Sequence, residues 1–202
     1  MDDATSQPRP GRTPHWLLKL GLEVLLISAG VFVALLGDGW RERAGQREMA
    51  ERALDRFRAE VAENREAVAN VMEYHADIHG KIRAWLSASP EDRDAVGLRL
   101  QGIRVVWFES TAWDLALATE ALSYLDQDLA FEIADIYDSQ EGYADLTQGL
   151  LQAMYLRPPS EDIEPFLHSL LVYYDEVVGM EPQMIESYDR LLPRIDEALG
   201  SS

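Results

Sequence analysis

An apolar run near the start of the chain constrains the fold more than any other feature. Residues 20–37 contain one charge, Glu23, and one hydroxyl among 18 residues. At about 1.5 Å per residue, a helix of this length measures roughly 27 Å, close to the hydrocarbon thickness of a bilayer. Interfacial anchors bracket the run: Trp16, Lys19, Trp40, Arg41 and Arg43. We therefore expect a transmembrane helix over residues 16–40, in contact with the lipid bilayer and preceded by a disordered tail over residues 1–15.

A cleavable secretory signal would also place an apolar run at this position. The charge-free core over residues 24–36 is short enough for one, but no small-x-small cleavage motif precedes a polar segment. The chain instead continues into a helical pattern, WRERAGQREMAERALDRFRAEV. This continuation favours an uncleaved anchor.

Glu23 shares one helical face with small residues. Steps of three and four residues define a candidate helix-contact face made of Glu23, Ile27, Gly30, Ala34 and Gly37. Small residues let a second helix approach closely, and an intramembrane carboxylate normally faces protein or water. We predict that this face mediates self-association, as in a homo-oligomer, or docks another membrane protein. The alternative is that Glu23 lies near the headgroups and pairs with Lys19, one turn earlier.

Basic residues flank the predicted span unequally. Those that precede it are Arg9, Arg12 and Lys19; those that follow it closely are Arg41, Arg43, Arg47, Arg52, Arg56 and Arg58. This bias slightly favours a cytoplasmic C-terminal domain. A short basic tail before a first helix also suits an anchor that exports the rest of the chain, so a periplasmic domain stays open.

A second periodic pattern begins at Ala50. Apolar residues recur at alternating intervals of three and four, which predicts one long amphipathic helix that continues from the span, with Gly45 as its most easily bent point. The predicted packing stripe is Leu54, Phe57, Val61, Asn64, Val68, Val71, His75, Ile78, Ile82 and Trp85. Five heptads of this kind can form a coiled coil between two chains, with Asn64 setting the register. Because the aromatic members suit an uneven core better than a narrow seam, we favour packing against later helices of the same chain.

Helix stops divide the remaining sequence. The long helix ends in residues 87–95. Residues 96–111 are expected to be mostly irregular, although Leu98, Leu100 and residues 105–108 could form a short extended piece or another helical turn. Ser110 or Thr111 then caps a helix containing residues 112–122.

Two further segments complete the predicted fold. One helix starts at Asp126 or Asp128 and ends at the RPPS sequence. A last pair of helices follows from Ile163, divided at Gly179 and Pro182. With no period-2 strand pattern, the expected fold is all-α: an N-terminal transmembrane helix continues into a long amphipathic helix, packed in a bundle of four or five helices within an acidic domain over residues 41–202.

Charge is distributed unevenly along the chain, whose net charge is −18. Residues 1–108 carry 16 acidic and 15 basic side chains, whereas residues 109–202 carry 20 acidic and 3 basic ones. Such a field repels phosphate backbones, so we expect no nucleic-acid partner, and any charged partner should be basic. The chain has no cysteine, which excludes disulfides, thiol catalysis and thiolate zinc sites.

Two histidines form the one candidate metal motif. His75 and His79 are four residues apart and share a helical face, but Ala76 occupies the place of the glutamate in the metalloprotease pattern. We therefore favour a partly buried His75 within the stripe and a solvated His79, and we predict no metal and no cofactor. A metal-dependent hydrolase using both histidines is the weakest hypothesis.

Acidic and tyrosine side chains recur without a catalytic arrangement. The acidic cluster comprises Asp114, Glu120, Asp126, Asp128, Glu132, Asp135 and Asp138. In a chain this acidic, solvated helix faces explain it better than paired catalytic carboxylates. We expect core-edge positions, with hydroxyls reaching the surface, for Tyr124, Tyr137, Tyr143, Tyr155, Tyr173, Tyr174 and Tyr188.

Two stretches resemble a family of small bacterial single-pass membrane proteins of unknown function. The first ends its apolar helix in a Trp-x-Glu turn before a charged helix, through Glu23, Gly30, Val31, Ala34, Leu35, Trp40 and Glu42. The second is similar through Thr111, Leu117, Thr119, Leu122, Leu125, Leu129 and Tyr137, with Glu120 in place of a small residue. The resemblance implies a helical protein of the bacterial inner membrane and brings no known activity.

The sequence favours a binding role over catalysis. Our leading hypothesis is a non-enzymatic, membrane-anchored helical interaction or scaffold module that presents an acidic surface to a protein partner or self-associates. The alternative is a membrane-tethered sensory domain that binds a small ligand or cation between its helices.

Overall fold

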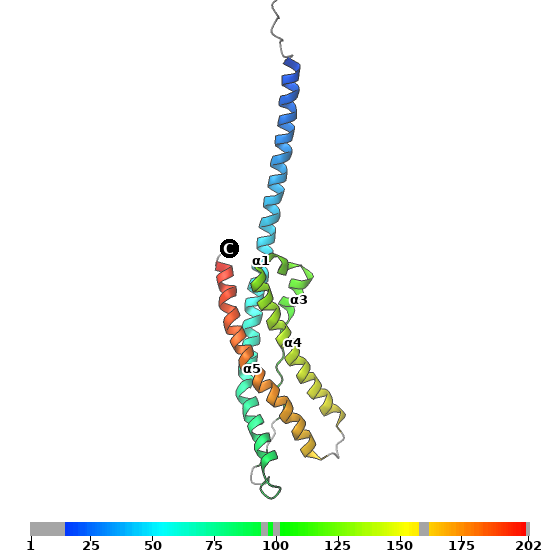
Figure 1. The fold of residues 1–202 in the computed structure, drawn as a ribbon, viewed down its shortest axis with the longest axis vertical. Helices are drawn as coiled ribbons and strands as arrows, with labels where there is room; N and C mark the ends of the chain where they lie inside the picture. The colour runs from blue at the N-terminus through cyan, green and yellow to red at the C-terminus, as the bar shows by residue number, and fades with distance from the viewer. Residues whose placement is uncertain (1–14, 94–96, 99–101, 158–161, 201–202) are drawn as a thin grey trace, which may run out of the picture. The chain divides into compact units, whose positions relative to one another are not determined.

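The computed structural model of the protein describes residues 15–93, 97–98, 102–157 and 162–200 (Figure 1). Across these residues the structure is all-α and contains no strand, which confirms the predicted fold class. Its elements in chain order are α1 (His15–Ser87), α3 (Thr111–Ala118), the 3₁₀ turn η1 (Ala121–Tyr124), α4 (Gln127–Leu156) and α5 (Ile163–Gly200). Except for His15, the predicted tail lies outside the described residues.

The chain divides into two compact units, and the boundary follows Gly45. The first unit, Met1–Gly45, holds the N-terminal part of α1, which is long and apolar enough to cross a membrane. Between Leu20 and Leu36, the large apolar side chains that the structure describes are between 53 % and 69 % exposed. Nothing in the described chain covers this apolar surface, as expected for a helix whose solvent is lipid.

The second unit, Gln46–Ser202, is built around three helices: the C-terminal part of α1, α4 and α5 (Figure 1). Ion pairs place α5 antiparallel to α1, because Arg58 pairs with Asp196 and Arg65, seven residues later, pairs with Asp189. A shared step of seven residues keeps the same faces of two helices in contact.

The predicted stripe of α1 forms one side of the core. Nine of its ten members are at most 9 % exposed, and Trp85 is partly buried. Because this burial occurs within a single chain, the heptad pattern is accounted for by packing against the chain's own helices.

The last helix differs from the prediction. In place of two helices divided at Gly179 and Pro182, α5 is one helix that contains both Pro182 and Pro193. Proline costs a helix one backbone hydrogen bond and a steric adjustment. Buried residues continue at steps of three and four across Pro182, from Val177 through Glu181 to Met184, so core packing on both sides of the proline holds the helix together.

The helix after the irregular segment also differs from the prediction. Instead of containing residues 112–122, α3 ends at Ala118, and Glu120 adopts a left-handed conformation with φ of 56°. This reversal starts η1 and buries Ala121. By contrast, Asp126 begins α4 as predicted, since its side chain accepts hydrogen bonds from the N–H groups of Asp128 and Leu129, both at 3.1 Å.

Candidate functional site

An extended segment crosses the second unit between Gly102 and Ser110. This segment, residues 103–110, has no regular secondary structure, as predicted for this part of the chain. Two polar members of the α1 stripe hold its backbone. His75 Nε2 lies 2.8 Å from the carbonyl oxygen of Arg104, and Asn64 exchanges two 2.8 Å hydrogen bonds with the N–H and C=O of Glu109. The two polar residues on an otherwise apolar stripe therefore position a segment far along the chain.

His75 also belongs to a buried cluster with α4 and α5. Its Nδ1 lies 2.5 Å from Glu181 Oε1, and the same oxygen accepts a hydrogen bond from the Tyr143 hydroxyl at 2.8 Å. His75 is 0 % and Glu181 1 % exposed, so His75 is more deeply buried than predicted. A carbonyl oxygen only accepts, so Nε2 carries a proton toward Arg104. One further proton then lies between Nδ1 and Glu181, and the pair is neutral as a whole whichever atom holds it.

A second buried carboxyl group, that of Glu60, connects α1 to α3 and α4. Its Oε2 accepts the N–H of Ala112 at 2.8 Å, and its Oε1 accepts the Tyr137 hydroxyl at 2.6 Å. Ser110, at the N-cap position, makes no side-chain capping bond, so Glu60 caps the first turn of α3 from another helix.

Five tyrosines are core residues rather than the predicted core edges: Tyr137, Tyr143, Tyr173, Tyr174 and Tyr188. Burial is the main cause that raises the pKa of all five phenols, and nearby Glu60 and Glu181 raise those of Tyr137 and Tyr143 further. The hydroxyls of four of them, Tyr137, Tyr143, Tyr173 and Tyr188, bond to buried polar groups, as in the 3.1 Å bond that Gln140 donates to Tyr188. Tyr124 and Tyr155 are exposed.

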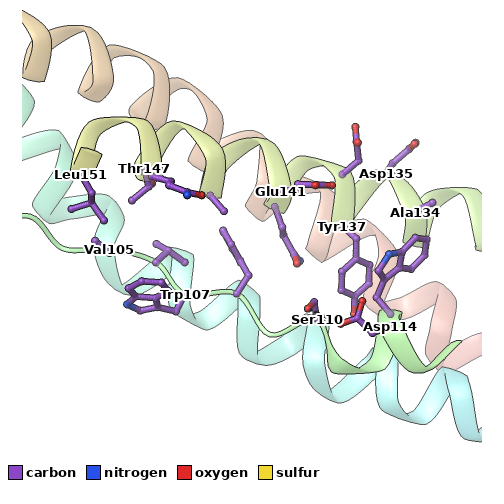
Figure 2. A pocket seen from close by; sticks show the side chains of 17 residues that line it. Val105, Trp107, Ser110, Asp114, Ala134, Asp135, Tyr137, Glu141, Thr147 and Leu151 are labelled. Atoms are coloured by element: carbon purple, nitrogen blue, oxygen red, sulfur yellow. Dashed lines mark hydrogen bonds between the residues drawn. The ribbon is translucent and has the colours of Figure 1, made fainter. Parts of the chain in front are cut away.

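A groove of about 970 Å³ lies between the extended segment and α4 (Figure 2). At one end, Figure 2 shows Val105 and Trp107 across from Thr147 and Leu151. At the other end, Trp113 stacks on Tyr137 with ring centroids 5.1 Å apart and planes inclined by 17°. The groove thus joins aromatic surface from the segment, α3 and α4.

Among the described residues that line the groove, the charged ones are all acidic: Asp114, Asp135, Asp138 and Glu141. All four are exposed, and none is in an ion pair within the described part of the chain. Most interhelical ion pairs instead join α1 to α5, where Arg58, Arg65 and Arg83 pair with aspartates. The groove therefore carries uncompensated negative charge beside aromatic rings, a combination that attracts cationic groups.

The other predicted site residues lie in the first unit, on the N-terminal part of α1. The membrane anchors Trp16, Lys19, Trp40, Arg41 and Arg43 are exposed, as are Glu23, Ile27, Gly30 and Gly37 of the candidate helix-contact face; the side chain of Ala34 lies outside those described. A Cβ added at Gly30 would meet no atom within 4 Å. Within this chain the small-residue face therefore has room for a neighbour.

His79 is not the solvated side chain that the sequence predicts. Its Nε2 lies 2.6 Å from Asp175 Oδ1, which also accepts a 2.7 Å bond from Arg83, and its side chain is 16 % exposed. His75 and His79 thus bond to separate carboxyl groups. No group of three or more metal-ligating side chains occurs among the residues that the structure describes.

Sequence reasoning missed the two buried glutamates. Glu181 is in phase with Val177 and Met184 on the buried stripe of α5, a signal hidden by the predicted break at Pro182. Glu60 is next to the stripe residue Val61. In the sequence alone it cannot be told apart from the solvated glutamates of α1, because its partners, Ala112 and Tyr137, are far away along the chain.

Comparison with protein-family models, with curated proteins and with solved structures finds no match to this chain. The family resemblance of the two stretches and the bacterial inner-membrane location therefore stay predictions.

Proposed function

We propose that this protein is a membrane-anchored helical module that binds a basic segment of a partner protein in the groove between α4 and residues 103–110. The observation that carries the proposal is the groove's composition: four exposed carboxylates and two tryptophans line one cavity, and none of its described lining residues is basic. Lysine and arginine combine a positive charge with a stem that packs on aromatic rings, so they suit this surface better than a neutral ligand.

The anchor sets where this binding occurs. The exposed apolar part of α1 supports a single crossing, and the basic residues that follow it favour a cytoplasmic second unit in a bacterial inner membrane. Restricting the groove to a membrane surface raises its effective concentration toward partners in the same membrane. Alkaline carbonate extraction should leave the full chain in the membrane pellet, and its release into the supernatant would contradict the anchor.

Binding is tested with the full chain in nanodiscs and a fluorescein-labelled peptide of about eight residues that alternates lysine and threonine. The variant Asp138→Asn/Glu141→Gln removes two groove charges and should weaken binding about tenfold or more, with a strong salt dependence in the wild type. The matched control Asp145→Asn/Glu186→Gln removes two exposed charges outside the lining and should bind nearly as wild type.

Equal weakening by both variants would show that the general acidity of the domain attracts the peptide, and would refute a role for the groove. Binding of a glutamate–threonine peptide with equal affinity would refute charge complementarity.

A further inference from the structure

The extended segment beside the groove has the composition of a β-strand. Residues 103–108 read Ile-Arg-Val-Val-Trp-Phe, in which β-branched and aromatic side chains predominate. Val106 is 4 % exposed, whereas Trp107 is 78 % exposed, so neighbouring side chains face different surroundings, as they do along a strand. Yet the described residues contain no strand that could pair with it.

The backbone of this segment is anchored at its ends and left without partners in its middle. Gly102, Arg104 and Glu109 are held by the side chains of Tyr74, His75 and Asn64. Between these points, the N–H and C=O groups of residues 105–108 make no hydrogen bond to the described chain. Backbone groups without protein partners have to bond to water or to a ligand, and an extended edge of this kind is a template for another strand.

We propose that the basic partner segment binds as an extended strand alongside residues 105–108. This inference rests on the proposed function and adds the conformation of the bound segment. Because α1 already holds the segment extended, binding has to order only the incoming peptide. Hydrogen bonds to the backbone supply affinity, and the carboxylates and rings of the groove select the basic side chains, as in other cases of strand addition.

The dimensions of the groove agree with such a peptide. Its α4 side is lined from Ala134 to Leu151, which at about 1.5 Å per residue spans roughly 25 Å. An extended peptide rises about 3.3 Å per residue, so seven or eight residues cover this length. Alternate side chains of such a peptide face the same way, so basic residues at every second position can all reach the acidic side of the groove.

Backbone N-methylation of the peptide tests the inference, because it removes N–H donors without changing charge. Only one edge of an added strand faces the segment, so alternate N–H groups differ in role. Two analogues of the lysine–threonine peptide are methylated, one at the odd and one at the even positions. With the full chain in nanodiscs, we expect one analogue to bind about tenfold or more weakly and the other nearly as the parent.

Three results distinguish the two proposals. Equal affinity of the parent and both analogues, or equal weakening of both, would overturn strand addition. If, in that case, Asp138→Asn/Glu141→Gln still weakens binding of the parent peptide, the proposed function stands even though strand addition fails. If that variant has no effect on the parent peptide, the proposed function itself fails. Urea unfolding of the variant, measured beside the wild type, tests whether a loss of binding comes from a loss of fold, and we expect the same midpoint for both proteins.

Discussion

Replacing Glu181 with leucine should destabilise the protein far more than replacing it with glutamine. Glu181 Oε1 serves both His75 Nδ1 and the Tyr143 hydroxyl in a site where Glu181 is 1 % exposed. Leucine leaves both of these polar groups buried without a partner. Each unsatisfied buried group costs about 1–3 kcal/mol, and removing one member of a buried ion pair costs about 3–5 kcal/mol. We therefore expect Glu181→Leu to lower the free energy of unfolding by about 4 kcal/mol, a large share of a typical domain's stability.

Glutamine preserves both contacts. Its amide nitrogen, placed where Oε1 of Glu181 lies, donates one N–H to His75 Nδ1 and the other to the hydroxyl oxygen of Tyr143, while Nε2 of the neutral imidazole still donates to Arg104. Glu181→Gln should cost about 1 kcal/mol or less.

The assay is urea unfolding of the full chain in detergent micelles, followed by far-ultraviolet circular dichroism. A double-mutant cycle with Tyr143→Phe isolates the shared contact. Removing the hydroxyl should cost about 1 kcal/mol in the wild type but should raise the free energy of unfolding by about 1–3 kcal/mol in the Glu181→Leu background, where the hydroxyl has lost its partner. The reasoning is refuted if leucine and glutamine cost the same, or if Tyr143→Phe costs the same in both backgrounds.

Three further predictions concern pH and the proline in α5. A phenol whose pKa is raised by folding contributes stability that is present below its unfolded pKa of about 10 and lost as the pH rises above that value. Phenolate absorbance should therefore appear in one step, together with unfolding, for Tyr137, Tyr143, Tyr173, Tyr174 and Tyr188. Ionisation of these phenols in a protein that keeps its helical signal would contradict this. Arg93 lowers the pKa of Glu164, so the contribution of this pair is present above the carboxyl's unfolded pKa and lost as the pH falls through its folded pKa. Arg93→Met should therefore lower the melting temperature at neutral pH but make little difference in acid, and an equal effect at both pH values would argue against the ion pair. Pro182→Ala restores a backbone donor at an exposed helix position and should raise the free energy of unfolding by about 1–3 kcal/mol; a decrease would show that the proline helps to shape α5.

Local patterns sufficed for the elements whose signal is short-range. The apolar run before Asp38 predicts a membrane-crossing helix from its length and composition alone. The three-and-four spacing from Leu54 to Trp85 predicts a long helix, because helix periodicity can be recognised from residues close together in the sequence. Asp126 likewise predicts the start of α4, since an N-cap side chain bonds to N–H groups only two and three residues away. The break predicted at Pro182 was wrong because packing of the flanking turns outweighs a local penalty.

The candidate groove required the tertiary structure, because its two sides come from separate stretches of chain, residues 105–114 and 134–151. Residues 103–110 have no periodic signal, and their path is set by side chains of α1 that are about 30 to 45 residues away. Composition also does not show which carboxylates are neutralised by a basic partner. Packing of α1 against α5 pairs Asp189 and Asp196 with arginines, whereas Asp138 and Glu141 on α4 line the groove. The sequence by itself thus determined a helical chain with one apolar helix long enough to cross a membrane and an acidic C-terminal half, since both depend on local composition. Only the tertiary structure decided which polar groups are buried, paired or left open, because those states depend on contacts between residues far apart in the chain.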